Sequence, residues 1–303
     1  MAFTAFSTAP ATTDAPRRRS RVALILLLPG ILYLLLFFLV PLVSLVLTSL
    51  QAPAEFGDIG QYQSAFRWEN YTAVVGQYGT QIVRSFVYAL LATVFALLFS
   101  YPLAYFIGVT ARPWPLLQKL MLVLVIAPFF ISFLLRTLAW KQLLSDESPI
   151  VTGLKALSLL APDAYVTGTP FAVVFGLTYN FIPFMTLPLY AALERLDLRY
   201  LEAGSDLYAS PFTTFRTVTV PLSMPGIVAG VLLTFIPAAG DYVNASREFL
   251  GGTGTAMMGN VIESNFLVSL NYPAAASLSI ILMAVILVLV TVYVKRSGTE
   301  DLL

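Results

Sequence analysis

The chain has 303 residues, of which 58% are hydrophobic and 11% are charged, and its formal net charge at pH 7 is +1. Soluble globular domains carry roughly 25% charged residues, so this composition, with a mean hydropathy of +0.83, indicates a chain that lies mostly against lipid or other apolar helices. The absence of cysteine and histidine excludes disulfides, thiolate metal sites and imidazole catalysis, and the balanced charge argues against a nucleic-acid surface.

Six apolar segments are long enough to cross the membrane, for which a helix needs about 20 residues. They run from about Val22 to Leu47, Ile82 to Val109, Leu116 to Leu135, Phe171 to Leu193, Gly226 to Val243 and Ala274 to Val294. We therefore predict an all-α integral membrane protein with six transmembrane helices over residues 21–297. Residues 1–20, rich in Ala, Thr and Pro, are expected to be disordered, and residues 298–303 to form a short tail. Segments 48–80 and 144–169 are expected to be external loops that could hold short interfacial helices.

The positions of the basic residues predict the orientation of these spans. Four arginines precede the first span, Arg195, Arg199 and Arg216 lie between the fourth and fifth spans, and Lys295 and Arg296 follow the last. Because cytoplasmic loops are enriched in Lys and Arg, we expect both termini and segment 194–225 to face the cytoplasm.

Segment 194–225 is a polar stretch between two apolar spans. Its apolar residues are spaced for one face of short helices, and these are Leu198, Leu201, Leu207, Phe212 and Phe215. Arg199 and Glu202 are placed to pair at i,i+3 on a charged face that also carries Arg195 and Asp206. Pro211 is expected to end the first helix. The pattern predicts a helix–turn–helix on the membrane face, although a solvated amphipathic loop would give the same pattern.

The spacing of this segment resembles the EAA loop of ATP-binding-cassette (ABC) importer permeases. Glu202-Ala203 stands at its start and Val218-Thr219-Val220-Pro221 at the expected distance. Gly204 replaces the usual second alanine, and Tyr208 replaces the usual glycine. The resemblance implies a type I importer permease with a MetI-like bundle, whose loop docks on a cytoplasmic ATPase. The implied coupling residues are Glu202, Ala203, Gly204, Asp206, Tyr208 and Pro221.

Three further runs, at residues 235–243, 250–252 and 258–262, resemble the spermidine/putrescine permease subunits of the PotB or PotH type. The resemblance implies a polyamine cargo, with thiamine, ferric iron or aminoethylphosphonate as alternatives in related permeases. It also implies a bacterial inner-membrane location, a second, PotC-like permease subunit as heterodimer partner, two ATP-binding subunits, an external substrate-binding protein and surrounding lipid.

The sequence lacks a G-x-x-x-x-G-K-[ST] phosphate loop, so we expect no cofactor on this chain and expect ATP and Mg²⁺ to be used by the partner ATPase. The glycine-rich run 251–255 lacks the lysine and is interpreted as a flexible external turn. An intramembrane enzyme would need convergent catalytic groups, and no span carries two aspartates. A stand-alone channel would not need the loop. We therefore expect a transport subunit rather than an enzyme.

A path for a flexible polycation needs carboxylates and aromatic faces. Because ionisable residues at membrane depth usually face the bundle interior, Asp241, placed in the outer part of the fifth span after Pro237, is the first candidate. The others are Tyr242, Asn180, Tyr179, Phe184 and Glu263. Each has an alternative role. Asp241 could be solvated at the interface or paired with Arg136 or Arg84, Glu263 could be an external acid that touches a binding protein, Asn180 could join two helices, and Tyr179 and Phe184 could be packing residues.

Overall fold

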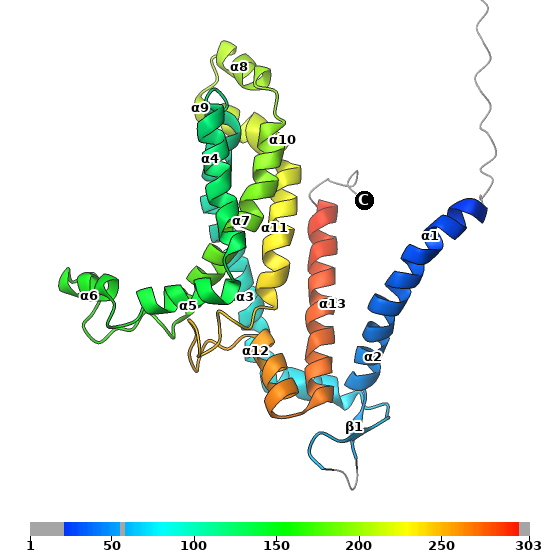
Figure 1. Ribbon diagram of the computed structural model, residues 1–303. Coiled ribbons are helices and arrows are strands. Elements are labelled where there is room, and N and C mark those ends of the chain that lie inside the picture. Colours follow the sequence, from blue (N-terminus) through cyan, green and yellow to red (C-terminus); the bar gives the residue numbers. More distant parts are fainter. Residues whose placement is uncertain (1–20, 55–57, 297–303) are drawn as a thin grey trace, which may run out of the picture. The chain divides into compact units, whose positions relative to one another are not determined.

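The computed structural model describes residues 21–54 and 58–296, and these residues are mostly helical (Figure 1). The predicted disorder of residues 1–20 and the predicted tail at 298–303 lie outside the described residues. The chain divides into two compact units, one ending at Leu45 and the other beginning at Val46. Each unit is described by itself.

The first unit is the N-terminal apolar helix. It contains α1 (Arg21–Leu34), the π-helical turn η1 (Leu35–Leu39) and the start of α2 (Val40–Ser49). The 24 residues Leu26–Ser49 have a mean hydropathy of 2.7, which is long and apolar enough to cross a membrane. The wide turn ends two residues before Pro41, whose ring would clash with the carbonyl of a normal α-helical turn. The helix predicted for the first span is confirmed.

The second unit begins with a short antiparallel pair, β1 (Ala52–Pro53) and β2 (Tyr62–Gln63), in which Ala52 pairs with Gln63. Its helices follow in chain order: α3 (Glu69–Tyr105), η2 (Phe106–Thr110), α4 (Pro115–Ile126), η3 (Ala127–Phe130), α5 (Phe133–Leu143), α6 (Pro149–Ala156), α7 (Pro170–Glu194), α8 (Arg199–Asp206), α9 (Pro211–Thr214), η4 (Phe215–Thr219), α10 (Val220–Leu222), α11 (Met224–Ala239), α12 (Met258–Glu263), η5 (Ser264–Val268) and α13 (Tyr272–Arg296).

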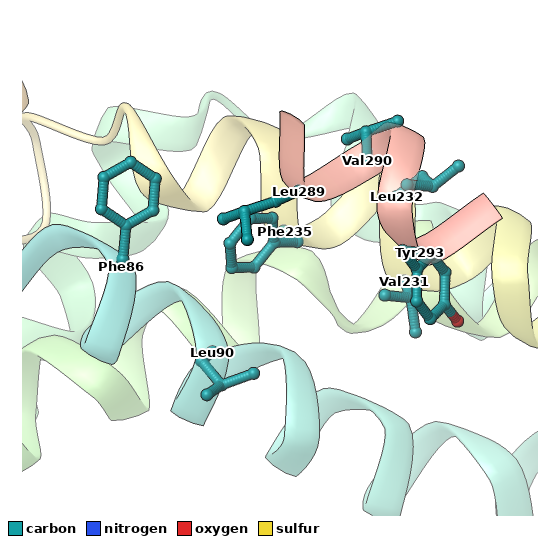
Figure 2. A pocket seen from close by; sticks show the side chains of 8 residues that line it. All are labelled: Phe86, Leu90, Val231, Leu232, Phe235, Leu289, Val290 and Tyr293. Atoms are coloured by element: carbon teal, nitrogen blue, oxygen red, sulfur yellow. The ribbon is translucent and has the colours of Figure 1, made fainter. Parts of the chain in front are cut away.

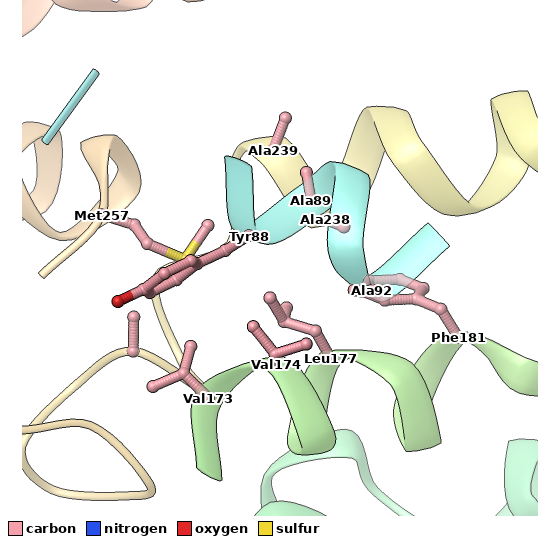
Figure 3. Packing of buried hydrophobic residues seen from close by; sticks show 11 residues of the cluster. Tyr88, Ala89, Ala92, Val173, Val174, Leu177, Phe181, Ala238, Ala239 and Met257 are labelled. Carbon is pink, nitrogen blue, oxygen red and sulfur yellow. The ribbon is translucent and has the colours of Figure 1, made fainter. Parts of the chain in front are cut away.

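The core of this unit is formed where α3, α7 and α11 pack together. Small residues line the contact, with Ala89 and Ala92 from α3 and Ala238 and Ala239 from α11 fully buried around Leu177 of α7 (Figure 3). Small side chains let helix backbones approach closely, which is how helices associate in lipid without a hydrophobic driving force. The outward faces of these helices remain apolar and exposed, as expected for surfaces that meet lipid.

Among residues 21–54 and 58–296, four helices are long and apolar enough to cross a membrane, and six are if each of two bent pairs counts as one span. The pairs are α4–η3 with α5, bent by 97°, and α9–α10 with α11, bent by 67°. The predicted fourth and sixth spans match α7 and α13, whereas the count of six stays a prediction. Within the second unit, the C-terminal end of α13 and the α8–α10 segment lie toward the same end of the bundle (Figure 1).

Segment 48–80 contains the short helix that it was expected to be able to hold, because α3 begins at Glu69 and continues through a kink at Tyr78 (φ −116°, ψ 16°). Two other predicted boundaries are wrong. The third span is interrupted at Ile131, which is extended after the 3₁₀ turn that contains Pro128. The fifth helix ends at Ala239 rather than Val243, two residues after Pro237. In both of these cases a proline shortly before the break outweighs the apolar run.

Candidate functional site

The segment between α7 and α11 forms the predicted helix–turn–helix. α8 and α9 lie at one end of the bundle, beyond the ends of α7 and α11 (Figure 1). The Ser210 hydroxyl caps α9 by accepting a hydrogen bond from the Thr213 amide at 3.2 Å. The two helices pack at Gly204, where a β-carbon would lie 2.8 Å from Thr214 Oγ1. An alanine at position 204 would therefore require the Thr214 side chain to shift.

Both ends of this segment are fixed to the bundle. At its start, Arg112 donates hydrogen bonds to the carbonyls of Leu193 (2.6 Å) and Glu194 (2.7 Å), the last residues of α7. At its end, the buried Tyr101 hydroxyl of α3 lies 2.8 Å from the Ser223 hydroxyl, at the bend before α11. The segment is therefore in direct hydrogen-bond contact with the bundle at both ends.

An aromatic contact strengthens the second attachment. The Phe215 ring packs edge-on against Tyr101, with ring centroids 5.3 Å apart, and against Tyr105 at 6.1 Å. Edge-to-face pairs of this kind contribute about 0.5–1.5 kcal/mol beyond the area that they bury.

Glu202 lies in the first turn of α8 and is exposed. The expected ion pair between Glu202 and Arg199 is not formed. Lys155 and Asp146 make the one ion pair found in the described part of the chain. Ala203 and Asp206 are also exposed, and so is Pro221 near the entry to the fifth span. The Glu202 carboxylate is thus open to a partner molecule. Tyr208, at the end of α8, is 98% exposed.

At the opposite end of the bundle, polar residues form a chain that joins three segments. Asp241, just beyond α11, accepts hydrogen bonds from the Asn244 amide (2.8 Å) and side chain (3.2 Å). The side-chain oxygen Oδ1 of Asn244 accepts a hydrogen bond from the side-chain nitrogen Nδ2 of Asn180 in α7 at 3.2 Å. Asn180 also donates to the Thr137 hydroxyl of α5 at 3.1 Å. The joining role considered for Asn180 is therefore observed, and Asp241 is linked to it through Asn244.

Asp241 is 7% exposed and forms no ion pair with the residues that the structure describes. Arg84 instead donates to the Ala256 carbonyl at 3.0 Å, and the Arg136 guanidinium lies 5.7 Å from the centre of the Phe133 ring, so the alternative of an Asp241–arginine pair is wrong. Burial raises the pKa of Asp241 to about 6, against the lowering effect of the hydrogen bonds from residues 243–245. Buried carboxylates are normally paired with a positively charged group, so the unpaired Asp241 carboxylate is unusual.

The remaining path candidates are dispersed. Tyr179 packs edge-on against Trp140, with centroids 5.1 Å apart, and Phe184 packs against Phe129 at 4.9 Å. Tyr242, although next to Asp241, is half exposed. These contacts agree with the packing alternative for Tyr179 and Phe184.

Glu263 faces a separate, open cavity of about 560 Å³, which Glu248 and Arg247 also line. Burial raises the pKa of Glu263, and the negative charge of Glu248 raises it further. The structure therefore does not bring Glu263 together with Asp241.

Comparison with known proteins places the chain in a family. The PotB spermidine/putrescine transport system permease protein of Haemophilus influenzae is 38% identical over 230 residues, which are 76% of this chain and 79% of the relative. The chain belongs to the PotB family of permeases. The Escherichia coli PotB protein is 34% identical over 88% of this chain and 94% of its own length. No protein-family model matches the chain.

Solved structures confirm the fold of this PotB-family chain. A bacterial ABC transporter that imports the polysaccharide alginate is 18% identical, with a TM-score of 0.65, over 93% of this chain and 97% of the other. The MetNI methionine ABC transporter gives a TM-score of 0.54 at 16% identity, over 73% of this chain and 94% of the other. The expected ABC importer permease fold is confirmed. The chain is a multi-pass protein of the bacterial inner membrane and a transport subunit rather than an enzyme.

A second hollow of this PotB-family chain is apolar throughout. It measures about 320 Å³ and lies between α3, α11 and α13 (Figure 2). Its walls include Phe86, Phe235 and Tyr293, and none of the candidate residues of the loop or path lines it. It is therefore not part of the candidate site.

The residues that sequence reasoning missed are those that hold the PotB-family site together. Arg112, Tyr101 and Thr137 gave no local signal, because their partners lie 40 or more residues away in the sequence. The glycine run 251–255, interpreted as a flexible turn, contains a turn at the exposed Thr253 and Gly254, whereas Gly251 is buried and the preceding Leu250 accepts a hydrogen bond from the Gly168 amide at 2.9 Å.

Gly176 of α7 supports the polar chain from behind. A β-carbon there would lie 2.3 Å from Leu250 Cδ1 and 2.6 Å from Asn244 Oδ1. We expect Gly176→Ala to lower the stability of the folded chain by about 1–3 kcal/mol, because the added methyl must displace Asn244 from Asn180. The midpoint of thermal unfolding of the purified chain measures this change. Gly254→Ala, at a glycine with nothing within 4 Å, is the matched control and should leave the midpoint unchanged.

Proposed function

We propose that this chain is the permease subunit of an ABC importer for polyamines and that it forms part of the path for spermidine or putrescine. The observation that carries the proposal is the match to proteins named spermidine/putrescine permeases at 34–38% identity over most of the chain. Thiamine, ferric iron and aminoethylphosphonate are the alternative cargoes.

The partners follow from the type of transporter. The permease forms a bundle with a second, PotC-like permease subunit, two ATP-binding subunits bind on the cytoplasmic side, and an external binding protein delivers the substrate. ATP and Mg²⁺ are used by the ATP-binding subunits, and this chain binds no cofactor. The exposed Glu202 on a segment fixed at both ends by Arg112 and Tyr101 supports a coupling role for Glu202, Ala203, Gly204, Asp206, Tyr208 and Pro221.

Two buried acceptors support a cation path near Asp241. Among the described residues, the Asp241 carboxylate forms no ion pair, and the side-chain oxygen Oδ1 of Asn180 has no hydrogen-bond partner. An alkylammonium group donates three hydrogen bonds and carries the opposite charge, so it satisfies both acceptors when the path opens. Tyr242, Tyr179 and Phe184 would supply aromatic faces along the path, and Glu263 a carboxylate in the outer cavity.

The cargo is tested with the assembled complex and its binding protein in proteoliposomes. Putrescine or spermidine should stimulate ATP hydrolysis several-fold, as expected when a substrate-loaded partner shifts the complex toward its catalytically competent state. Thiamine and ferric iron should not. Stimulation by one of these two alone would assign the chain to another cargo, and polyamine flux through this chain without any ATPase would exclude the importer mechanism.

A further inference from the structure

The end of α8 adopts a backbone conformation that usually requires glycine. The Ala209 amide donates to the Gly204 carbonyl at 3.0 Å, and the Tyr208 amide donates to the Ser205 carbonyl at 3.0 Å. These two bonds define a Schellman motif, in which the residue after the helix cap must be left-handed. Tyr208 occupies that position with φ of +55°. A side chain there is disfavoured because its β-carbon approaches a carbonyl oxygen, and glycine avoids this contact.

Nothing inside the described part of the chain compensates for this conformation. The Tyr208 side chain is 98% exposed, and its ring and hydroxyl make no ring contact or hydrogen bond with the described residues. Leu207, the residue before Tyr208 in the chain, and Phe212 of α9 are 80% and 71% exposed. The folded chain therefore exposes three large side chains along this segment, and one of them, Tyr208, holds a strained backbone conformation.

We propose that Tyr208, with Leu207 and Phe212, anchors the coupling segment in an apolar slot of the ATP-binding subunit. This inference rests on the proposed coupling function and adds the residue that carries the binding energy. Tyrosine is enriched among the residues that dominate interface energies, because its large rigid ring is apolar while its hydroxyl remains polar. The Tyr208 ring would fill this slot, and a glycine at position 208 would leave the slot empty.

The charge of the segment favours a protein partner over the membrane surface. α8 carries Glu202 and Asp206 but one basic residue, Arg199. Helices that lie on anionic membranes have polar faces rich in Lys and Arg, and acidic residues are repelled by the lipid headgroups. Leu207, Tyr208 and Phe212 therefore belong to an interface with the ATP-binding subunit, on the same segment as the exposed Glu202.

Tyr208→Gly separates binding from folding. Glycine adopts φ of +55° without strain, so the thermal midpoint of the purified chain should stay the same or rise. Its affinity for the purified ATP-binding subunit of the same transporter, measured with the full-length chain in nanodiscs, should fall about tenfold. Tyr208→Asn, which also tolerates this conformation, should weaken binding equally, whereas Tyr208→Phe, which keeps the ring, should retain most of it.

Ser158→Gly is the matched control, because Ser158 is another exposed non-glycine residue with positive φ (56°), located just after α6. It should leave the affinity unchanged. Wild-type affinity in Tyr208→Gly, together with uncoupling by a Glu202 variant, would overturn the anchor while the coupling function stands. A photoreactive phenylalanine analogue at position 208 should label the ATP-binding subunit, and labelling of lipid alone would assign these three side chains to the membrane and overturn the proposal.

Discussion

Replacing Glu202 with alanine is expected to lower ATP-dependent uptake by at least about tenfold while the chain still inserts and folds. The carboxylate is exposed and forms no ion pair within the described part of the chain, so its loss should change stability by no more than about 0.5 kcal/mol. If it pairs with a basic group on the ATP-binding subunit, removing it leaves that group unpaired, which costs about 2 kcal/mol or more. Uptake of labelled spermidine, together with the amount of chain in the membrane, measures the effect.

Glu202→Gln tests whether the charge or the shape matters, because it keeps the side-chain length and removes the negative charge. Asp163→Ala removes an exposed acid between α6 and α7 and should leave uptake unchanged. ATP hydrolysis in the Glu202 variants should continue without transport, since the ATP-binding subunits are unchanged and only their contact with Glu202 is lost. Wild-type uptake in Glu202→Ala would contradict a docking role for this segment.

The helices of this chain were predictable where a single local property decides them. Apolar run length located α7 and α13 almost to the residue, and prolines and charges located the coupling segment between Glu194 and Pro225. The break at Ile131 was not predictable, because Leu116 to Leu135 is apolar on both sides of it. A hydropathy pattern measures whether a segment prefers lipid, and it does not measure the direction in which the backbone continues.

The candidate site was predictable as a list of residues but not as an arrangement. Asp241 and Asn180 were both identified, yet Asn244, which joins them, was not, because its role depends on a turn that brings residue 244 back onto α7. The glycine run 251–255 has the composition of a turn and forms one at Thr253–Gly254, but close contact between Gly252 and Gly168 packs its first residues against the loop before α7. Composition describes what a backbone can do, and long-range contacts select one conformation.

Asp241→Asn is expected to raise the KM for spermidine uptake by about tenfold. Asparagine keeps the volume of the side chain and removes the charge that attracts an ammonium group, and charged hydrogen bonds contribute about 1.5–3 kcal/mol. The pKa of about 6 provides a second measurement. A carboxylate with this pKa binds cations above pH 6 and loses its charge as the pH falls through that value. Wild-type uptake should therefore fall between external pH 7 and 5, and Asp241→Asn should lose this part of the pH dependence.

A purely structural role for Asp241 gives a different result, because its carboxylate accepts hydrogen bonds from residues 243–245 and so holds their turn. Asn244→Ala breaks the side-chain bonds to Asp241 and Asn180 while it leaves the carboxylate and the bond from the Asn244 amide in place. If Asp241 contacts the substrate, Asn244→Ala should raise KM less than Asp241→Asn and should keep the fall in uptake below pH 6. If Asp241→Asn and Asn244→Ala raise KM equally, and the pH dependence of uptake in Asp241→Asn stays that of the wild type, the carboxylate holds the turn and does not contact the polyamine.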